Sequence, residues 1–535
     1  MKTRISLIAI LLWAVGLSAQ IHIQLPDSGN WSTEALRPYL NKVVVFDMPM
    51  IVCSNANGNY VVSPWRRFQP ESQPEANETS RINSTCMFSI SNIPSPTTEM
   101  GEPSHRCGEK IYGLTAKVDK TSPSKLEWQT GGTWHGNTRA DLEAGLPDLG
   151  NYRLLVCGFN LENYFMSLGS MGAKTEKDRQ RQRTKVSKAL KKINADIYGL
   201  VELQQGNEAV AEIVNDLNNN LPGRNYKYFR DATSGSMQKV EFVYDANKVE
   251  PIGTPAETNV ELSYRKKMIC FREIATGEKF VYSINHFKSM NTGGADRREN
   301  EARAVISLYN SYRQNRNVRD NDVLIMGDLN CYAFTSPIKI FTNNGMIDLH
   351  RAFHADSSYS YMYANMASYI DHAISNETLY RQVTGMAAYH INSDEDDQYT
   401  YDKSSDATMF RCSDHDPVLV GLKLDSTLSL PIKPYMNNGN LGKDSLTFYC
   451  LYTPSDQDPL VYFDIYTVNG FQVCPPTKMD YQGELFEEHT KYYTLSSTNT
   501  DLPDEVKQFL PLPPGIYVLH FYYKGTVTSH KLIVR

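Results

Sequence analysis

Six short polar clusters in this chain place amide, carboxylate and imidazole side chains at the ends of apolar runs. The runs are rich in β-branched and aromatic residues, which is typical of buried strands. In layered α/β folds a buried strand fixes the polar side chain at its end, so chemistry gathers along that edge. The clusters are Phe159-Asn160, Glu202, Asn285-His286-Phe287-Lys288, Gly327-Asp328-Leu329-Asn330, Tyr369-Ile370-Asp371-His372 and Ser413-Asp414-His415-Asp416-Pro417. Gathered at one edge, they predict a hydrolytic metal site that acts on phosphate.

Two of these clusters suggest specific roles. Asp328 and Asn330 are two residues apart, so both side chains can project to one side after the strand. The carboxylate can hold or activate a water, and the amide can donate to phosphate oxygens. His415, with Asp371 to orient its ring, suits acid–base work. Taken singly, each cluster also fits an ordinary strand turn or a structural histidine, so the prediction depends on all six together.

The six clusters, in this order, resemble the endonuclease/exonuclease/phosphatase superfamily, which includes deoxyribonuclease I and the abasic-site endonucleases. The similarity spans residues 151–425 and is greatest to the large extracellular bacterial nucleases of that superfamily. The stretches that carry it are Gly158–Phe165, Asn194–Glu202, Ile284–Ser289, Tyr359-Ser360-Tyr361, Tyr369–Ala373 and Val383-Thr384-Gly385.

This resemblance implies a four-layered α/β sandwich with two facing mixed sheets. It also implies phosphodiester hydrolysis assisted by a divalent cation, Mg²⁺ in the first place, with Mn²⁺ or Ca²⁺ as alternatives. Glu202 would be the main metal ligand, with Asn160 and Asp414 beside it. Magnesium prefers such carboxylate ligation with retained waters.

The resemblance also assigns the remaining site residues. Asp328 would orient or deprotonate the attacking water, and Asn330 would contact the phosphate. His415, oriented by Asp371, and His286 would handle protons or stabilise developing charge. Arg265, in Ser263-Tyr264-Arg265-Lys266, would bind phosphate. Apart from the resemblance, Lys288 alone fits a solvated surface cation, but beside His286 it can also bind phosphate.

One position departs from the pattern of deoxyribonuclease I. That enzyme has an acid, paired with its first catalytic histidine, just before its Phe-rich middle strand. The corresponding stretch here is Ser236–Glu241, and its nearest aligned residue is Gln238. The acid partner of His286 is therefore left open.

Two helices are expected within this region, at about Thr175–Ile193 and Arg297–Arg313. Apolar residues of the first recur on one face at helical spacing, and lysines and arginines occupy the others. Such a charge run is usually a solvated face, but its excess also fits contact with a phosphate backbone.

The flanking regions are predicted to be separate β domains. Residues 21–148 contain short strand-like runs, such as Val43–Phe46, and predict a small, OB-like β domain. Glu71–Asn83 is expected to be a loop, and Gly131–Gly150 a linker. Beyond a linker at 426–445, residues 445–535 predict a β-sandwich, which resembles the sorting domain of bacterial type IX secretion; a plain binding sandwich is the alternative.

Residues 1–20 resemble a secretory signal peptide, with a positive start, a short apolar core and small residues before Gln20. Export permits disulfides. There are nine cysteines and no CxxC pair, which argues against a zinc site. Pairings among Cys53, Cys86 and Cys107, and between Cys450 and Cys474, are all compatible with the sequence.

The chain has 535 residues, enough for two to four domains, and a formal net charge of −6. This mild acidity argues against broad, charge-driven coating of nucleic acid, but not against a nuclease with a local cation. We therefore expect a magnesium-dependent endonuclease acting on DNA, with RNA as a second candidate substrate, secreted or at the cell surface of a bacterium after export through the periplasm. Its partners would be nucleic acid and the secretion machinery. The alternatives are a phosphoesterase on phospholipid headgroups or inositol phosphates, and a catalytically dead surface binding protein.

Overall fold

The computed structural model describes the chain in two compact units, Met1–Arg67 with Ser80–Thr138, and Phe68–Thr79 with Arg139–Arg535. The described residues are 20–24, 32–55, 59–96, 104–130, 132–169, 171–231, 235–260, 262–290, 293–315, 318, 320, 322–424, 434–436, 446–451, 461–478, 490–495, 512–513, 515–523 and 526–534. Residues 1–19 of the expected signal peptide and most of the linker at 426–445 lie outside these ranges.

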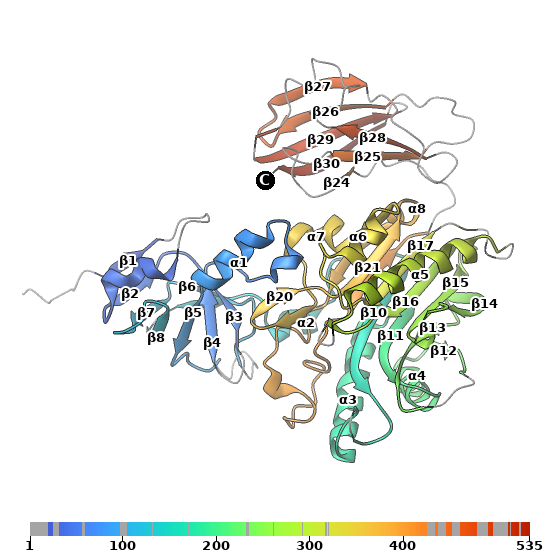
Figure 1. The fold of residues 1–535 in the computed structure, drawn as a ribbon, viewed down its shortest axis with the longest axis horizontal. Coiled ribbons are helices and arrows are strands. Elements are labelled where there is room, and N and C mark those ends of the chain that lie inside the picture. Colours follow the sequence, from blue (N-terminus) through green and yellow to red (C-terminus); the bar gives the residue numbers. More distant parts are fainter. Residues whose placement is uncertain are drawn as a thin grey trace, which may run out of the picture. The chain divides into compact units, whose positions relative to one another are not determined.

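The first unit is built on one nine-stranded sheet with the order β1-β2-β7-β8-β5-β4-β3-β6-β9 (Figure 1). Side chains such as Val44, Phe46 and Val62 alternate inward along the strands and form its apolar core. The strands are β1 (Ile21–Ile23), β2 (Val43–Phe46), β3 (Met50–Ser54), β4 (Tyr60–Ser63), β5 (Phe88–Ser91), β6 (Lys110–Tyr112), β7 (Thr115–Val118), β8 (Lys125–Thr130) and β9 (Thr133–His135), with a 3₁₀ helix, η1, at Thr33–Tyr39.

Two segments expected to lack regular structure contain helices and a strand. The stretch Glu71–Asn83 holds most of α1 (Ala76–Thr85), preceded by the 3₁₀ helix η3 (Pro70–Ser72). The stretch Gly131–Gly150 holds β9 and α2 (Arg139–Ala144). Because α1 buries none of its residues, its sequence carries no hydrophobic periodicity that would indicate a helix.

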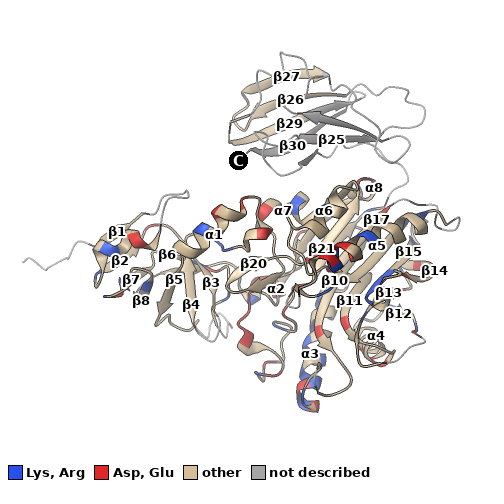
Figure 2. Cartoon of the chain, in the orientation of Figure 1, with Lys and Arg blue, Asp and Glu red and all other residues tan. Residues whose placement is uncertain are grey.

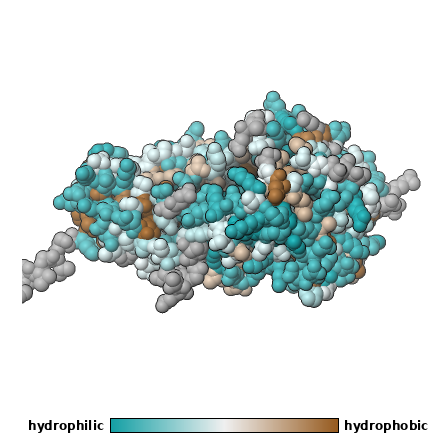
Figure 3. Space-filling view, turned by 90° about the horizontal axis from the view of Figure 1, so that it is seen from below, coloured by the Kyte–Doolittle hydropathy of each residue, from teal (hydrophilic) through white to brown (hydrophobic). Residues whose placement is uncertain are grey.

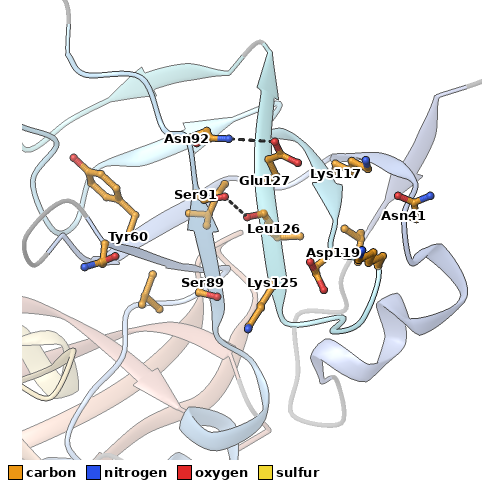
Figure 4. Close-up of a pocket in the computed structure, with 15 residues that line it drawn as sticks. Asn41, Tyr60, Ser89, Ser91, Asn92, Lys117, Asp119, Lys125, Leu126 and Glu127 are labelled. Carbon is orange, nitrogen blue, oxygen red and sulfur yellow. Dashed lines mark hydrogen bonds between the residues drawn. The ribbon is translucent and has the colours of Figure 1, made fainter.

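A groove of about 610 Å³ lies on the sheet of the first unit (Figure 4). Its lining combines an apolar floor, including Ile90 and Leu126, with Lys117, Lys120 and Lys125. Asn92 donates to Glu127 across it at 3.1 Å. In the part of the chain that the structure describes, the His/Cys/Asp/Glu group placed to hold a metal ion lies elsewhere, so this groove is not the predicted hydrolytic site.

Two six-stranded mixed sheets form the centre of the second unit. Their orders are β12-β13-β11-β10-β23-β22 and β14-β15-β16-β17-β21-β18. The strands of the first are β10 (Leu154–Tyr164), β11 (Ile197–Gln204), β12 (Tyr226–Tyr228), β13 (Gln238–Asp245), β22 (Val383–Ala388) and β23 (Val418–Leu422). Those of the second are β14 (Val249–Glu257), β15 (Lys266–Glu273), β16 (Lys279–His286), β17 (Val323–Asp328), β18 (Met346–Asp348) and β21 (Asp371–Asn376). Buried residues of both sheets, including Val156, Tyr282 and Met326, share one apolar cluster between them.

Helices cover the outer faces of both sheets (Figure 1). Buried residues of α3 (Glu176–Ile193) and α4 (Glu208–Asn220) share a core with β10 and β11. Residues of α5 (Ala295–Arg313) and α6 (Ser336–Thr342) share another with β16 and β17. The expected four-layered α/β sandwich is therefore confirmed, as are both helices of this region predicted from sequence. The unit also contains η5 (Ser263–Arg265), α7 (Leu349–His354), η7 (Ala355–Ser357), the hairpin strands β19 (Tyr361–Tyr363) and β20 (Met366–Ser368), α8 (Glu377–Tyr380) and η8 (Asp397–Tyr399).

The basic residues of α3 are largely paired within the domain. Figure 2 shows acidic and basic residues interleaved along this helix. Arg179 contacts Glu176 and Glu212, and Arg183 contacts Asp216 at 2.7 Å. Lys185 is fully buried, 3.6 Å from Asp406. The helix therefore offers much less free positive charge to a polyanion than its sequence indicates.

The C-terminal strands form two further antiparallel sheets, β24-β25-β28 and β27-β26-β29-β30. Phe463, Ile465 and Leu519 are fully buried on the four-stranded sheet. The strands of these two sheets are β24 (Pro434–Met436), β25 (Leu446–Leu451), β26 (Val461–Thr467), β27 (Gln472–Lys478), β28 (Thr490–Leu495), β29 (Gly515–Tyr523) and β30 (Thr526–Val534). The expected β-rich region after residue 425 is thus present.

The cysteine pairings suggested for the N-terminal region are not formed. Cys53, Cys86 and Cys107 are buried thiols. The Cys53 thiol donates to the carbonyl of Trp65 at 3.4 Å, and that of Cys107 to the Asn55 side chain at 3.5 Å. Cys474 is a buried thiol as well.

The face of the molecule seen in Figure 3 is mostly hydrophilic, with hydrophobic atoms in small separate areas. Among the described helices, none combines the length and apolar character needed to cross a membrane.

Candidate active site

Three strands of the second sheet bring predicted residues to one edge. β16 ends at His286, β17 ends at Asp328 and β21 begins at Asp371. His286 pairs in register with Asp328, and Asp328 with Asp371. Gly327 lies inside β17 with a φ of 122°, and it leaves no room for a side chain, because a Cβ there would lie 2.9 Å from the backbone nitrogen of Asn285. The strand order therefore places these three polar side chains next to one another.

The first sheet supplies the facing residues. Asn160 lies in β10, Glu202 in β11, and Asp414 and His415 shortly precede β23. Asn160 donates through Nδ2 to Asp328 Oδ2 at 3.1 Å, which joins the two sheets across the site. Ser413 donates to the carbonyl of Asn160 at 2.7 Å and fixes the loop before β23.

Glu202, His286 and Asp328 form a compact group whose ligating atoms all lie within 4.8 Å of one another. His286 Nε2 is 3.6 Å from both Glu202 Oε1 and Asp328 Oδ2. Burial raises the pKa of Glu202, and the Asp414 carboxylate raises it further. Burial also raises the pKa of Asp328 to about 7, with Asp371 and Glu202 adding to the rise against the opposing charge of His415.

This group fits a divalent cation. Two carboxylates in a buried site repel each other when both are ionised, which adds to the effect of burial on their pKa values. A bound cation would neutralise this negative charge and favour the ionised forms. Burial, and then the charges of Arg265 and His415, hold the pKa of His286 well below its usual value, so its imidazole is neutral and can offer a lone pair.

His415 and Asp371 form a buried pair beside this group. His415 Nδ1 lies 2.8 Å from Asp371 Oδ2, and its Nε2 lies 4.0 Å from Asp328 Oδ2 and 3.8 Å from Asp414 Oδ1. Burial by itself would lower the pKa of His415, but Asp371, Asp414 and Asp328 outweigh burial and hold that pKa well above its usual value. The 4.0 Å distance from His415 Nε2 to Asp328 Oδ2 is too long for a direct hydrogen bond. It suits a water molecule or a substrate oxygen that contacts both side chains.

The other nitrogen of His286 is not held by an acid. His286 Nδ1 is buried and has no hydrogen-bond partner among the described residues. Gln238, the nearest residue by alignment, donates instead to Asn163 Oδ1 at 2.6 Å. Asn163 in turn donates its backbone N–H to Glu202 Oε2 at 2.9 Å. Gln238 therefore supports Glu202 rather than His286.

Cationic and amide groups border the same site. Arg265 donates through Nη2 to the carbonyl of Phe287 at 3.2 Å, and its buried Nε has no partner among the described residues. Burial lowers the pKa of Arg265, while Glu202 and Asp328 oppose that effect. Asn330 donates to the same carbonyl at 3.2 Å. The Lys288 backbone N–H donates to Glu301 at 2.9 Å.

Two further residues at the site lie in stretches that carry the family resemblance, but the sequence assigned no role to either. Glu162 lies just beyond Asn160 with a left-handed φ of 52°. Burial raises its pKa to about 8, with Asp414 adding to the rise. Tyr361 packs its ring on His415, with centroids 4.8 Å apart. The resemblance of the stretches Gly158–Phe165 and Tyr359-Ser360-Tyr361 is the signal that includes these residues, but a lone Glu or Tyr within such a stretch is too common for the sequence to assign it a role.

The comparisons agree with this geometry. Residues 157–415 match the model of the Endonuclease/Exonuclease/phosphatase family. Members of that superfamily are hydrolases acting on phosphoester bonds and generally use a divalent metal. A search of curated proteins finds no match.

Several solved structures are similar to the chain. An endonuclease/exonuclease/phosphatase family protein from Bacteroides thetaiotaomicron is 20% identical over 52% of this chain and 98% of its own, with a TM-score of 0.38. A mannosyl-6-phosphatase of the same organism is 18% identical over 51% and 100%, with a TM-score of 0.37. D. rerio TDP2 complexed with a single-strand DNA product is 13% identical over 51% and 99%, with a TM-score of 0.36. These values are too low to bear on the substrate.

Proposed function

We propose that this protein is a divalent-metal-dependent phosphodiesterase that hydrolyses nucleic acid and acts as an extracellular DNA endonuclease. The observation that carries the proposal is the metal-competent group of Glu202, His286 and Asp328 directly beside the paired His415 and Asp371. A deactivated binding protein would have no need to keep such a group intact.

In this proposal Glu202 is the principal ligand for Mg²⁺, with Asn160 and Asp414 beside it. The cation would offset charge on the phosphate and lower the pKa of water. Asp328 orients the attacking water and accepts its proton; the raised pKa of its carboxyl, about 7, suits a base working near neutral pH. His415, held by Asp371, donates to developing charge on the phosphate or to the leaving oxygen.

Nucleic acid is the proposed substrate because the Arg265 Nε–H is buried at the site without a partner among the described residues, where a backbone phosphate would lie. Lys288, two residues after His286, adds a second cation to this part of the chain. The resemblance of residues 151–425 to extracellular bacterial nucleases supports the same choice. The signal-like residues 1–20 and the sorting-domain resemblance of residues 445–535 support export through the periplasm to the surface or medium, with the secretion machinery as partner.

The decisive experiment is cleavage of supercoiled plasmid by the purified full chain with Mg²⁺, with EDTA, and as the variants Asp328→Ala and His415→Ala. We expect nicked circles with Mg²⁺, none with EDTA, and a loss of roughly 100-fold or more in each variant. The exposed Asp148→Ala serves as the matched control. Failure of a folded, Mg²⁺-supplied chain on both DNA and RNA would overturn the nuclease proposal. Hydrolysis of inositol phosphates or phospholipids by that preparation would then assign it to the small-substrate alternative.

A further inference from the structure

The hairpin formed by β19 and β20 contacts the His415–Asp371 pair through a side-chain hydrogen bond, a backbone bridge and a ring contact. Ser360, just before β19, donates its hydroxyl to Asp371 Oδ2 at 2.7 Å, the same oxygen that meets His415 Nδ1. The carbonyl of Ser360 accepts from the Asp416 backbone N–H at 2.8 Å. Tyr361 forms a β-bridge with His415 as well as the ring contact. The position of the hairpin therefore sets the position of both members of the pair.

Residues Phe68–Gln73, here called the strap, fasten this hairpin from a remote part of the chain. Phe68 forms a parallel β-bridge with Ala367 of β20. Gln69 donates its backbone N–H to the carbonyl of Ala367 at 2.9 Å and its side chain to the carbonyl of Tyr363 at 3.0 Å. Gln69 is 6% exposed. The strap thus lies beside β20 like a third strand of the hairpin.

The strap is itself anchored to the domain at its other end. The Phe334 backbone N–H donates to the carbonyl of Glu71 at 3.1 Å, and Gln73 donates through its side chain to the carbonyl of Asp356 at 2.9 Å. The strap belongs to the second compact unit, together with the rest of Phe68–Thr79. The chain before it, Met1–Arg67, and the chain after it, Ser80–Thr138, belong to the first unit. These contacts make it an integral part of the catalytic domain.

An isolated two-stranded hairpin is marginally stable in water. Among the described strands, β19 and β20 pair with each other and with no strand of the two large sheets, and Tyr363 at their turn is 55% exposed. The order of the hairpin must therefore come from flanking contacts, and the strap provides the backbone pairing along β20.

We propose that the strap is a positioning element of the active site, which holds the β19–β20 hairpin so that Ser360 and Tyr361 fix Asp371 and His415. Ser360 and Gln69 are positioning residues, since neither has to touch the substrate. As far as it concerns turnover, this inference rests on the proposed phosphodiesterase function.

The first test is hydrogen exchange of the full-length protein, which does not depend on activity. In Gln69→Ala we expect amides of 360–368 and the Asp416 amide to exchange at least about threefold faster than in the wild type. Segments of α4 and β11 should be unchanged. Gln180→Ala, an exposed glutamine on α3, is the control. Unchanged exchange across 360–368 and at Asp416 would overturn the proposal, whatever the substrate proves to be.

The second test is kinetic, with bis(4-nitrophenyl) phosphate and plasmid as probes. Ser360→Ala should lower kcat roughly 10-fold or more and Gln69→Ala roughly 3-fold, both with unchanged KM. Ser368→Ala removes an equally buried hydroxyl of the same hairpin that has no partner among the described residues, and should leave kcat within about twofold.

A double-mutant cycle decides whether strap and hairpin act together. If the strap works through Ser360, the double variant Gln69→Ala/Ser360→Ala will be little slower than Ser360→Ala alone. The proposal would be contradicted if the fold-losses in kcat of the two single variants multiplied in the double variant. An equal loss of kcat in Ser368→Ala and Ser360→Ala would contradict it as well. A wild type inactive on both probes would refute the proposed function alone, since hydrogen exchange would still decide the role of the strap.

Discussion

At the scale of single residues, the site holds more buried acid than its own cations neutralise. Burial and the acidic neighbours Asp371 and Glu202 raise the pKa of Asp328 in the folded chain to about 7. An unperturbed aspartate has a pKa of about 3.9. The folded state therefore keeps its proton longer than the unfolded state as pH rises. For a carboxyl with a raised folded pKa, relative stability is greatest below about pH 4 and is lost as pH rises towards 7. Glu202, whose pKa is also raised, acts in the same direction.

This imbalance predicts a pH-dependent effect of metal on stability. At about pH 8 the Asp328 carboxyl, whose pKa is raised to about 7, is ionised, so Mg²⁺ should raise the melting temperature by at least about 2 °C, as expected for roughly 1 kcal/mol in a domain of this size. At about pH 5 protonation competes with the cation, and the shift should vanish. Scanning calorimetry at both pH values measures it. Equal shifts at the two pH values, or an undiminished shift in Glu202→Gln, would contradict a cation held by these carboxylates.

The cations at the border of the site predict a second outcome. Removing Arg265, whose Nε–H is buried without a partner among the described residues, should lower kcat/KM by about 10- to 100-fold in Arg265→Gln, since charge-assisted bonds to phosphate contribute about 1.5–3 kcal/mol. Lys288→Ala should lose about 10-fold, mainly through KM. The exposed Lys227→Ala is the control for loss of a positive charge. Steady-state kinetics on a nucleic acid decides it, and an Arg265→Gln variant with wild-type kcat/KM would remove this residue from the phosphate site.

Much of the site was predictable at this scale because a buried strand fixes the position of the polar residues at its end. Asn160, Glu202, His286, Asp328 and His415 meet since the strand order brings their ends together. The surroundings of His286 Nδ1 were not predictable. Gln238, the residue aligned with the expected acid, donates to Asn163 instead, and the strand pattern does not encode such a side-chain hydrogen bond. The roles of Ser360 and Glu162 likewise depend on contacts that only the folded chain shows.

At the scale of elements, the two sheets approach closely where glycine removes a side chain. A Cβ at Gly199 of β11 would lie 2.6 Å from Ile284 Cδ1 of β16, closer than real contacts allow. We expect Gly199→Ala to destabilise the protein by about 1–3 kcal/mol through overpacking, or roughly 2–12 °C in melting temperature. Gly145→Ala, where nothing lies within 4 Å, is the control. An unchanged melting temperature in Gly199→Ala would mean that the sheets separate freely at this point.

The elements show why sequence pattern succeeded for strands and failed elsewhere. Runs such as Val418–Leu422 are buried along their whole length, so composition alone marks them. Helix α1 buries nothing. In α3, Arg179 and Arg183 are paired with acids of α4, and Lys185 lies beside Asp406. Charge along a helix gives its surface pattern but not the acids that fold against it.

At the scale of the whole molecule, the site residues all belong to the second compact unit, and the segment 68–79, which includes the strap, is the portion of residues 1–138 that this unit takes in. No described contact of the site involves the C-terminal sheets. Ending the chain at residue 425 should therefore leave metal-dependent turnover, measured on plasmid and on bis(4-nitrophenyl) phosphate, within about twofold of the full chain. A larger loss in a folded preparation would give the C-terminal sheets a part in turnover.

Starting the chain at residue 139 should have a different result, because it removes Gln69 and its pairing with β20 while keeping every residue that would touch metal or phosphate. We expect this variant to bind Mg²⁺ with the same pH-dependent thermal shift but to turn over at least about threefold more slowly at unchanged KM. Supplying residues 68–79 again, joined by a flexible linker ahead of residue 139, should restore part of kcat. Full activity without residues 1–138 would show that the hairpin is held by the rest of the domain, and the strap would then be a connection without a role in catalysis.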